Sequence, residues 1–201
     1  MNLFTLLLLA LAAETPATDY TPVFENDWVR VVKIHYAARE KTAIHDHPAT
    51  PNVFVYTTDG GHLRIAHDEH EQPTIRPLVK AGGIRYQKGV FERHWVEEMD
   101  GVDSEYVRME LKTKAVDLPE QDVRRAPDDR TPYESGMLRI FRVTCAAQSA
   151  CPASVHPQDP AIVVIGRDAQ WVPENASPLL NASAKPLEMV RVELVSRPIG
   201  K

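Results

Sequence analysis

The chain has no excess of positive charge. Its 201 residues include 23 Lys and Arg against 28 Asp and Glu, which gives a net charge of -5 and a pI near 5.9. No basic patch stands out along the sequence, so no nucleic acid is expected as a partner. A composition that is 43% hydrophobic and 25% charged suits a soluble globular protein of one large or two small domains.

The chain also lacks an apolar run long enough to span a bilayer. The run NLFTLLLLALAA at 2–13 has 12 residues, which is too few. Glu14 and a Pro/Thr-rich tract follow, and Ala10 and Ala12 fit the small-residue rule for signal cleavage. We therefore predict a signal peptide and leader at 1–19, no stable membrane span, and a periplasmic or secreted protein. Because no Lys or Arg stands near the start, a buried first strand or a retained anchor remains an alternative.

Cysteine is nearly absent. Cys145 and Cys151 are the only two, and they stand six positions apart in CAAQSAC. Two cysteines at this spacing without supporting histidines do not make a zinc site. In an oxidising compartment they predict a disulfide, and a pair of free thiols is the alternative.

An internal repeat is the most informative feature. A shift of 109 positions lays 24–59 over 133–168 without a gap, and nine of the 36 pairs are identical. Roughly two identities would be expected by chance from ordinary composition. EYVRMEL at 105–111 likewise matches EMVRVEL at 188–194, at an offset of 83. The chain is therefore predicted to contain the same β unit twice, with the second copy shortened.

The predicted domains follow from this repeat. The 16 prolines and the Val/Ile-rich runs divide the chain into short segments between turns, which favours an all-β design. We expect an N-terminal domain at 20–114 and a shortened C-terminal domain at 131–201. The polar, charged and proline-bearing stretch at 115–130 is predicted to be the linker between them.

Two histidines mark a candidate metal site. His45 and His47 stand one residue apart at the mouth of an apolar segment that reads as a strand. Side chains at i and i+2 of a strand point to the same face, so the two imidazoles could converge on one metal ion. At the repeat offset, Ser154 replaces His45 and His156 matches His47. The site is therefore expected in the first unit alone.

These residues resemble the motifs of the cupin superfamily. His45 and His47 match the paired histidines of the first cupin motif, and His94 matches the histidine of the second. Arg39 stands where the first motif usually has Gly, and Asn52 stands in its Glu position. Gly83, Gly89, Phe91 and Glu98 reproduce the spacing of the second motif, but Gly89, Phe91 and Glu98 stand where that motif has Pro, its second Gly and Asn.

The resemblance implies a fold and a cofactor. The fold would be two tandem cupin-like antiparallel β-barrels, of the double-stranded β-helix or jelly-roll type, the second one degenerate. The cofactor would be a divalent transition metal bound by His45, His47 and His94, with Asn52 in the remaining ligand position. Iron, zinc, manganese, nickel and copper all stay open, because three imidazoles suit each of them.

The sequence does not name a reaction. Arg85 and Tyr86, close to His94, are predicted to be catalytic residues that meet a small anionic or aromatic substrate. Three functions stay open: an exported metalloenzyme of the dioxygenase or isomerase type, a non-enzymatic bicupin that binds a small ligand or metal, and a structural cupin with no occupied site. A small molecule is the expected partner and a homodimer is left open. His62, His67 and His70 are predicted to lie on a solvated hairpin, and a second metal site is the alternative.

Overall fold

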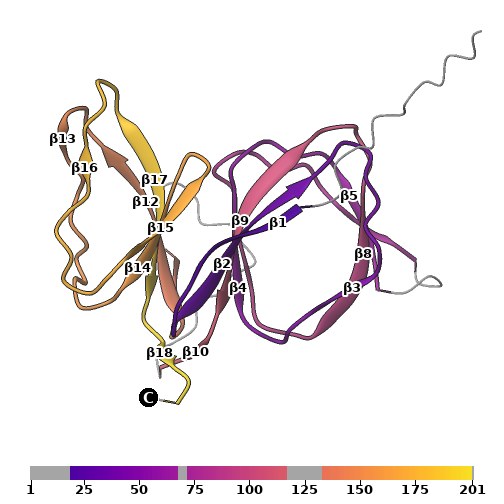
Figure 1. The fold of residues 1–201 in the computed structure, drawn as a ribbon, viewed down its shortest axis with the longest axis horizontal. Helices are drawn as coiled ribbons and strands as arrows, with labels where there is room; N and C mark the ends of the chain where they lie inside the picture. Colours follow the sequence, from indigo (N-terminus) through magenta and orange to yellow (C-terminus); the bar gives the residue numbers. More distant parts are fainter. Residues whose placement is uncertain (1–18, 68–71, 117–132, 201) are drawn as a thin grey trace, which may run out of the picture.

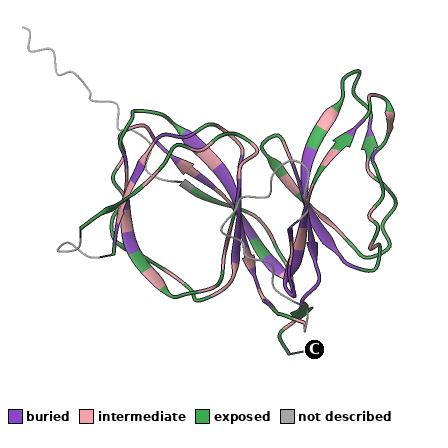
Figure 2. Cartoon of the chain, turned by 180° about the vertical axis from the view of Figure 1, so that it is seen from behind, coloured by how far each residue is buried: buried purple, intermediate pink, exposed green. Residues whose placement is uncertain are grey.

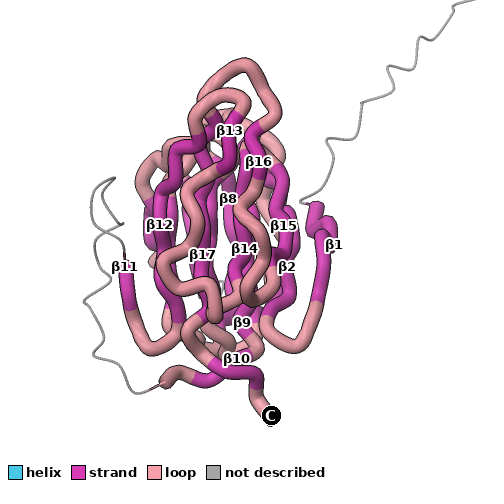
Figure 3. The backbone as a smooth tube through the Cα atoms, turned by 90° about the vertical axis from the view of Figure 1, so that its left-hand side faces the viewer, coloured by secondary structure: helices cyan, strands magenta, loops and turns pink. Residues whose placement is uncertain are grey.

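The computed structural model describes residues 19–67, 72–116 and 133–200. These residues form strands, turns and loops without a helix, as Figure 3 shows, which confirms the all-β prediction. No helical segment in these ranges is long and apolar enough to cross a membrane. The predicted leader at 1–19 and linker at 115–130 fall almost wholly outside the described residues and stay predictions.

Strands β1 to β10 form the N-terminal unit and strands β11 to β18 follow it (Figure 1). The first set is β1 (Asp19–Glu25), β2 (Val29–Tyr36), β3 (His45–His47), β4 (Asn52–Tyr56), β5 (Leu63–Ala66), β6 (Thr74–Arg76), β7 (Ile84–Gln87), β8 (Glu92–Glu98), β9 (Ser104–Leu111) and β10 (Thr113–Lys114). The second set is β11 (Tyr133–Glu134), β12 (Leu138–Cys145), β13 (Ser149–Ala150), β14 (Ala161–Ile165), β15 (Asp168–Val172), β16 (Leu180–Asn181), β17 (Leu187–Leu194) and β18 (Arg197–Pro198).

The strands pair into two unequal units. The N-terminal unit has a five-stranded sheet, β1-β2-β9-β4-β7, and a four-stranded sheet, β3-β8-β5-β6. The C-terminal unit has a five-stranded sheet, β11-β12-β17-β14-β15, and the two-stranded pair β13-β16. All of these pairings are antiparallel. Within the described ranges, the second unit therefore has the large sheet but no four-stranded partner, which agrees with the predicted shortening.

The two large sheets have the same construction. The offset of 109 carries the bounds of β2 onto those of β12, and the bounds of β4 onto those of β14. The offset of 83 carries β9 onto β17. β9 lies between β2 and β4, and β17 likewise lies between β12 and β14. Three strands of the four-stranded sheet, β5, β6 and β8, lie between β4 and β9, where the C-terminal unit has the shorter connection, whereas β3 lies between β2 and β4.

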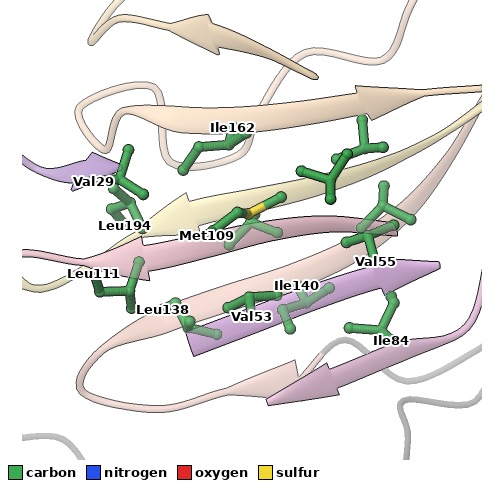
Figure 4. Packing of buried hydrophobic residues seen from close by; sticks show 14 of the residues in the cluster. Val29, Val53, Val55, Ile84, Met109, Leu111, Leu138, Ile140, Ile162 and Leu194 are labelled. Carbon is green, nitrogen blue, oxygen red and sulfur yellow. The ribbon is translucent and has the colours of Figure 1, made fainter. Parts of the chain in front are cut away.

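The two large sheets pack face to face. Buried side chains such as Val53 and Met109 from one sheet meet Leu138, Ile140 and Ile162 from the other, as Figure 4 shows. The buried segments accordingly gather where the two units meet (Figure 2). Because neighbouring side chains of a strand alternate between faces, each strand gives only half of its side chains to this shared core.

The other face of the N-terminal large sheet covers a second core. Val32, Ile34, Phe54 and Tyr106 from the large sheet pack there with Leu63 of the small sheet. The molecule thus has three layers, with the four-stranded sheet on the side away from the C-terminal unit (Figure 1). This inner space of the first unit is where the predicted histidines lie.

The predicted disulfide is present in the C-terminal unit. Cys145 and Cys151 are bonded, with their Cα atoms 4.5 Å apart. Both are buried, and they pack with Val163 and Met189 in a small apolar cluster. The bond closes the turn between β12 and the strand pair β13-β16.

Two departures from the cupin motifs meet at one turn. Arg39 takes a φ of 60°, in the left-handed region where glycine is the usual residue. Its backbone N–H donates to Oε2 of Glu98, which is 2% exposed and also accepts from the N–H groups of Asp100 and Gly101. These bonds offset the cost of the Arg39 conformation. Glu98 is therefore a structural carboxylate that stabilises this turn.

Candidate metal centre

Antiparallel pairing of β3 with β8 assembles the centre. His45 lies opposite His94, and His47 lies opposite Glu92. Within each strand the two side chains are two positions apart, so all four point to the same face. His47, His94 and Glu92 line a cavity inside the N-terminal unit.

The three imidazoles form a compact triangle. The ring centroids are separated by 4.7 Å for His45 and His47, 4.9 Å for His45 and His94, and 4.8 Å for His47 and His94. The Nε2 atoms of His47 and His94 are 3.2 Å apart. Two nitrogens on a tetrahedral metal at about 2.1 Å would be separated by roughly 3.4 Å. The group therefore has the spacing that a transition metal requires, and its nitrogens all lie within 4.8 Å of one another.

Two of the rings are oriented for metal binding. His45 Nδ1 lies 2.9 Å from the Ala43 carbonyl, which can only accept, so the ring proton belongs on Nδ1. The lone pair is then on Nε2, which accepts from the Tyr20 hydroxyl at 3.3 Å. His94 Nδ1 is buried and lies 3.2 Å from Oε1 of Glu92. The carboxylate favours the same tautomer in His94. In metalloproteins, histidine ligands are oriented in this way, because the ring nitrogen that does not bind the metal donates to a carboxylate or a backbone carbonyl.

His47 has a different partner. Its Nδ1 lies 2.6 Å from Nη1 of Arg108, and a guanidinium only donates. In the metal-free protein the proton of neutral His47 therefore belongs on Nε2, which donates to Nε2 of His94. A metal bound at this atom requires the tautomer with the proton on Nδ1, which would face the Arg108 guanidinium. The three histidines therefore fit a metal provided that the contact between Arg108 and His47 rearranges, and a neutral imidazole binds without net release of a proton.

The environment favours the neutral form of His45 and His47. Burial and the nearby Arg108 lower the pKa of His47 to about 3. Burial also lowers the pKa of His45. The pKa of Glu92 is held well below its usual range by the His94 ring and the Gln87 amide. Uncharged imidazole is the form that binds metals, so these shifts favour a metal site at neutral and mildly acidic pH.

Asn52 is close to the histidines but is engaged elsewhere. It is 4% exposed, its amide nitrogen donates to the Thr50 carbonyl at 2.6 Å, and its amide oxygen accepts from Nε of Arg108 at 3.1 Å. This geometry gives Asn52 the role of holding Arg108. The structure instead brings Glu92 to the histidines as their carboxylate.

The predicted catalytic pair is divided between two faces of β7. Arg85 lines the cavity with His47 and His94, and its guanidinium lies over the Phe54 ring at 5.6 Å. Tyr86, the next residue, packs against the shared core, with its ring 5.8 Å from that of Tyr133. Because strand neighbours alternate, one of the two has to face away from the cavity. The structure therefore brings Arg85 to the site and does not bring Tyr86.

Four residues at the site were not predicted from the sequence: Glu92, Arg108, Arg76 and Tyr20. Glu92 had a readable signal, since it stands two positions before His94 in the same strand. Arg108 and Arg76 line the cavity, and the Tyr20 hydroxyl lies 3.3 Å from Nε2 of His45. Arg108, Arg76 and Tyr20 lie on separate strands, so no local spacing pointed to them.

A second cluster shares part of the site. His67, Glu92 and His94 also form a group of three possible ligands, with Nε2 of His67 3.5 Å from Oε1 of Glu92. His67 is thus closer to the site than the predicted solvated hairpin suggested, while His70 lies outside the described residues. In the described C-terminal residues His156 lies 3.4 Å from Glu193, and no group of three ligands occurs.

The solved structures described here resemble the chain with TM-scores below 0.5. No protein-family model and no curated protein matches the chain. A cupin domain from Bordetella pertussis Tohama I is 20% identical, over 50% of this chain and 99% of its own, with a TM-score of 0.42. AerE from Microcystis aeruginosa is 14% identical over 88% and 97%, with a TM-score of 0.49. A cupin 2 conserved barrel domain protein from Leptotrichia buccalis is 8% identical over 92% of each chain, with a TM-score of 0.47. The geometry of the histidines, and not these similarities, indicates what the site can do.

Proposed function

We propose that this protein is a cupin-type metal-binding protein that holds one divalent transition metal through His45, His47 and His94. The observation that carries the proposal is the triangle of three imidazoles on one face of the β3-β8 pair. Three nitrogen ligands leave coordination positions open, as a catalytic metal requires. When bound, the metal would supply a Lewis acid or an oxygen-binding centre.

The chain's own residues would prepare the site for a small molecule. Glu92 and the Ala43 carbonyl hold two of the rings in the tautomer that presents Nε2. Arg85 lies at the exposed side of the cavity and provides a cation for a substrate. An oxidoreductase of the dioxygenase type, or an isomerase, is the reaction class we propose, because both use an open metal centre beside a small binding cavity.

A second candidate is a binding protein without turnover. The cavity has a volume of about 50 Å³, well below the roughly 300–1,000 Å³ of ordinary ligand pockets. That size favours a metal with a very small ligand over a large substrate. Turnover of a small molecule by the metal-loaded protein would exclude this candidate.

Export is part of the proposal. The apolar N-terminal run and the disulfide between Cys145 and Cys151 both support an oxidising, periplasmic or extracellular location. Fractionation of cells that express the chain with and without residues 2–13 would test it. We expect loss of export in the shortened chain.

Elemental analysis tests the metal. The mature protein, purified without a histidine tag, is compared with a His45→Ala/His47→Ala double variant and with His62→Ala. His62 is a matched control because it pairs with Asp100 and lies outside the triangle. We expect about one equivalent of transition metal in the wild type and in the control, and almost none in the double variant. Metal-free wild-type protein after reconstitution would refute the proposal.

A further inference from the structure

The cavity beside the histidines carries an excess of guanidinium groups. Arg76 of β6, Arg85 of β7 and Arg108 of β9 all line it, and Glu92 is the single carboxylate among its lining residues. Charged groups are rarely placed inside a protein without partners, because desolvation costs several kcal/mol per ion. The source of compensation for each arginine therefore has to be identified.

Arg108 is compensated within the protein. Its Nη2 lies 3.2 Å from Oε1 of Glu110, its Nε donates to Asn52, and its Nη1 donates to His47. Each of the three nitrogens of this guanidinium has a partner within the protein, so the charge of Arg108 is compensated without a ligand.

Arg76 and Arg85 are less completely engaged. Among the described residues neither forms an ion pair with a carboxylate, and each guanidinium lies over an aromatic ring, that of Tyr56 or Phe54. Arg85 is exposed and therefore solvated by water, whereas Arg76 is half-buried. Nε of Arg76 is buried without a hydrogen-bond partner, and so is the hydroxyl of Tyr56, which is 4% exposed. A buried charged donor without an acceptor costs more than the roughly 1–3 kcal/mol of a neutral one. An anionic ligand would remove that cost.

The strand order places the two arginines at the mouth of the cavity. β6 is an edge strand of the small sheet and β7 is an edge strand of the large sheet. Val90 lines the same cavity and is 65% exposed, so the cavity opens to solvent near these edges. A ligand entering there would meet the arginines at one end, while His47 and His94 lie in the same cavity.

We propose that this cavity binds a small carboxylate anion through Arg76 and Arg85. The inference rests on the proposed function in one respect, because the metal of the histidines would be the centre that this anion faces. A guanidinium matches the planar carboxylate with two parallel N–H donors, and the apolar walls suit a short carbon stem. The volume of about 50 Å³ admits a carboxylate with few further atoms and disfavours a bulkier tetrahedral phosphate.

NMR titration with ¹³C-labelled acetate tests the proposal on metal-free and zinc-loaded full-length protein. The variants are Arg76→Gln and Arg85→Gln, and Arg93→Gln is the matched control, since Arg93 lies on β8 beside His94 but pairs with Asp46 outside the cavity. Phosphate and neutral acetamide are titrated in parallel. We expect saturable acetate binding in the wild type and the control, weakened at least tenfold in each cavity variant, and weaker or no binding of phosphate and acetamide.

The outcomes separate this inference from the metal proposal, because zinc content is measured on the same samples. Normal zinc content with no saturable acetate binding would overturn the anion site alone. Acetate binding that requires Arg76 and Arg85 in a protein that takes up no metal would support the anion site while the metal proposal fails. Equal acetate affinity in all variants, or tighter binding of phosphate, would overturn the assignment of a carboxylate to these arginines.

Discussion

Replacing Glu92 by Gln should weaken metal binding without unfolding the protein. Oε1 of Glu92 lies 3.2 Å from Nδ1 of His94, and the side chain also accepts from Nε2 of Gln87 at 3.0 Å. Glutamine keeps the shape and an acceptor oxygen but removes the negative charge that favours the Nδ1–H form of His94. The loss is therefore the electrostatic part of the contact.

The size of the effect follows from this contact. Loss of a partner behind a histidine ligand typically costs 10–100-fold in metal affinity. Because glutamine retains one acceptor, we place Glu92→Gln at the lower end, about tenfold or about 1.4 kcal/mol. Glu92→Ala, which removes the acceptor as well, should approach the upper end.

Competition against a chromophoric chelator with Zn(II) measures the affinity, and the visible spectrum of the Co(II) form reports the ligand set. Glu97→Gln is the matched control, because Glu97 lies on the same strand with its carboxylate on Arg64 at 2.8 Å, away from the histidines. An affinity of Glu92→Gln within twofold of Glu97→Gln would refute the role assigned to this carboxylate.

Three further predictions concern stability. Folded His47 has a pKa of about 3, whereas the unfolded chain takes up this proton near pH 6.5, so urea denaturation of the metal-free protein should show stability falling below pH 6.5. After allowance for the partial exposure of His47, the free energy of unfolding should fall by about 0.5–1 kcal/mol per pH unit. The His47→Gln variant should show a smaller dependence on pH, and an unchanged dependence would contradict this prediction. Cys145→Ser/Cys151→Ser should cost roughly 2 kcal/mol in urea, and no loss would contradict the disulfide. Leu138→Ala in the shared core should cost about 2–5 kcal/mol and lower one common calorimetric transition, whereas two separate transitions would show that the units unfold independently.

Local sequence patterns predicted much of the fold and part of the site. Alternating apolar positions and scattered prolines predicted an all-β chain, and the gapless repeat predicted a second large sheet of the same construction. The spacing of His45 and His47 predicted two imidazoles on one face, because strand side chains repeat every two residues. The same rule, applied to β7, would have assigned Arg85 and Tyr86 to opposite faces.

Other features depend on contacts between distant segments. The metal centre forms because His45 lies opposite His94 and His47 lies opposite Glu92 in the β3-β8 pair. This strand register cannot be predicted from the local periodicity of either strand. The roles of Asn52 and Arg108 were hidden for the same reason, since each is defined by a partner on another strand.

The sequence by itself determined the strand-forming segments, the histidine pair and the disulfide spacing, because each depends on neighbours within a few residues. Tertiary structure alone decided that the two large sheets share one core, that Glu92 is the carboxylate beside the histidines, and that Arg76 and Arg85 line one cavity. Strand register and sheet packing bring together residues far apart in the chain. Their burial and charge compensation are therefore properties of the folded molecule.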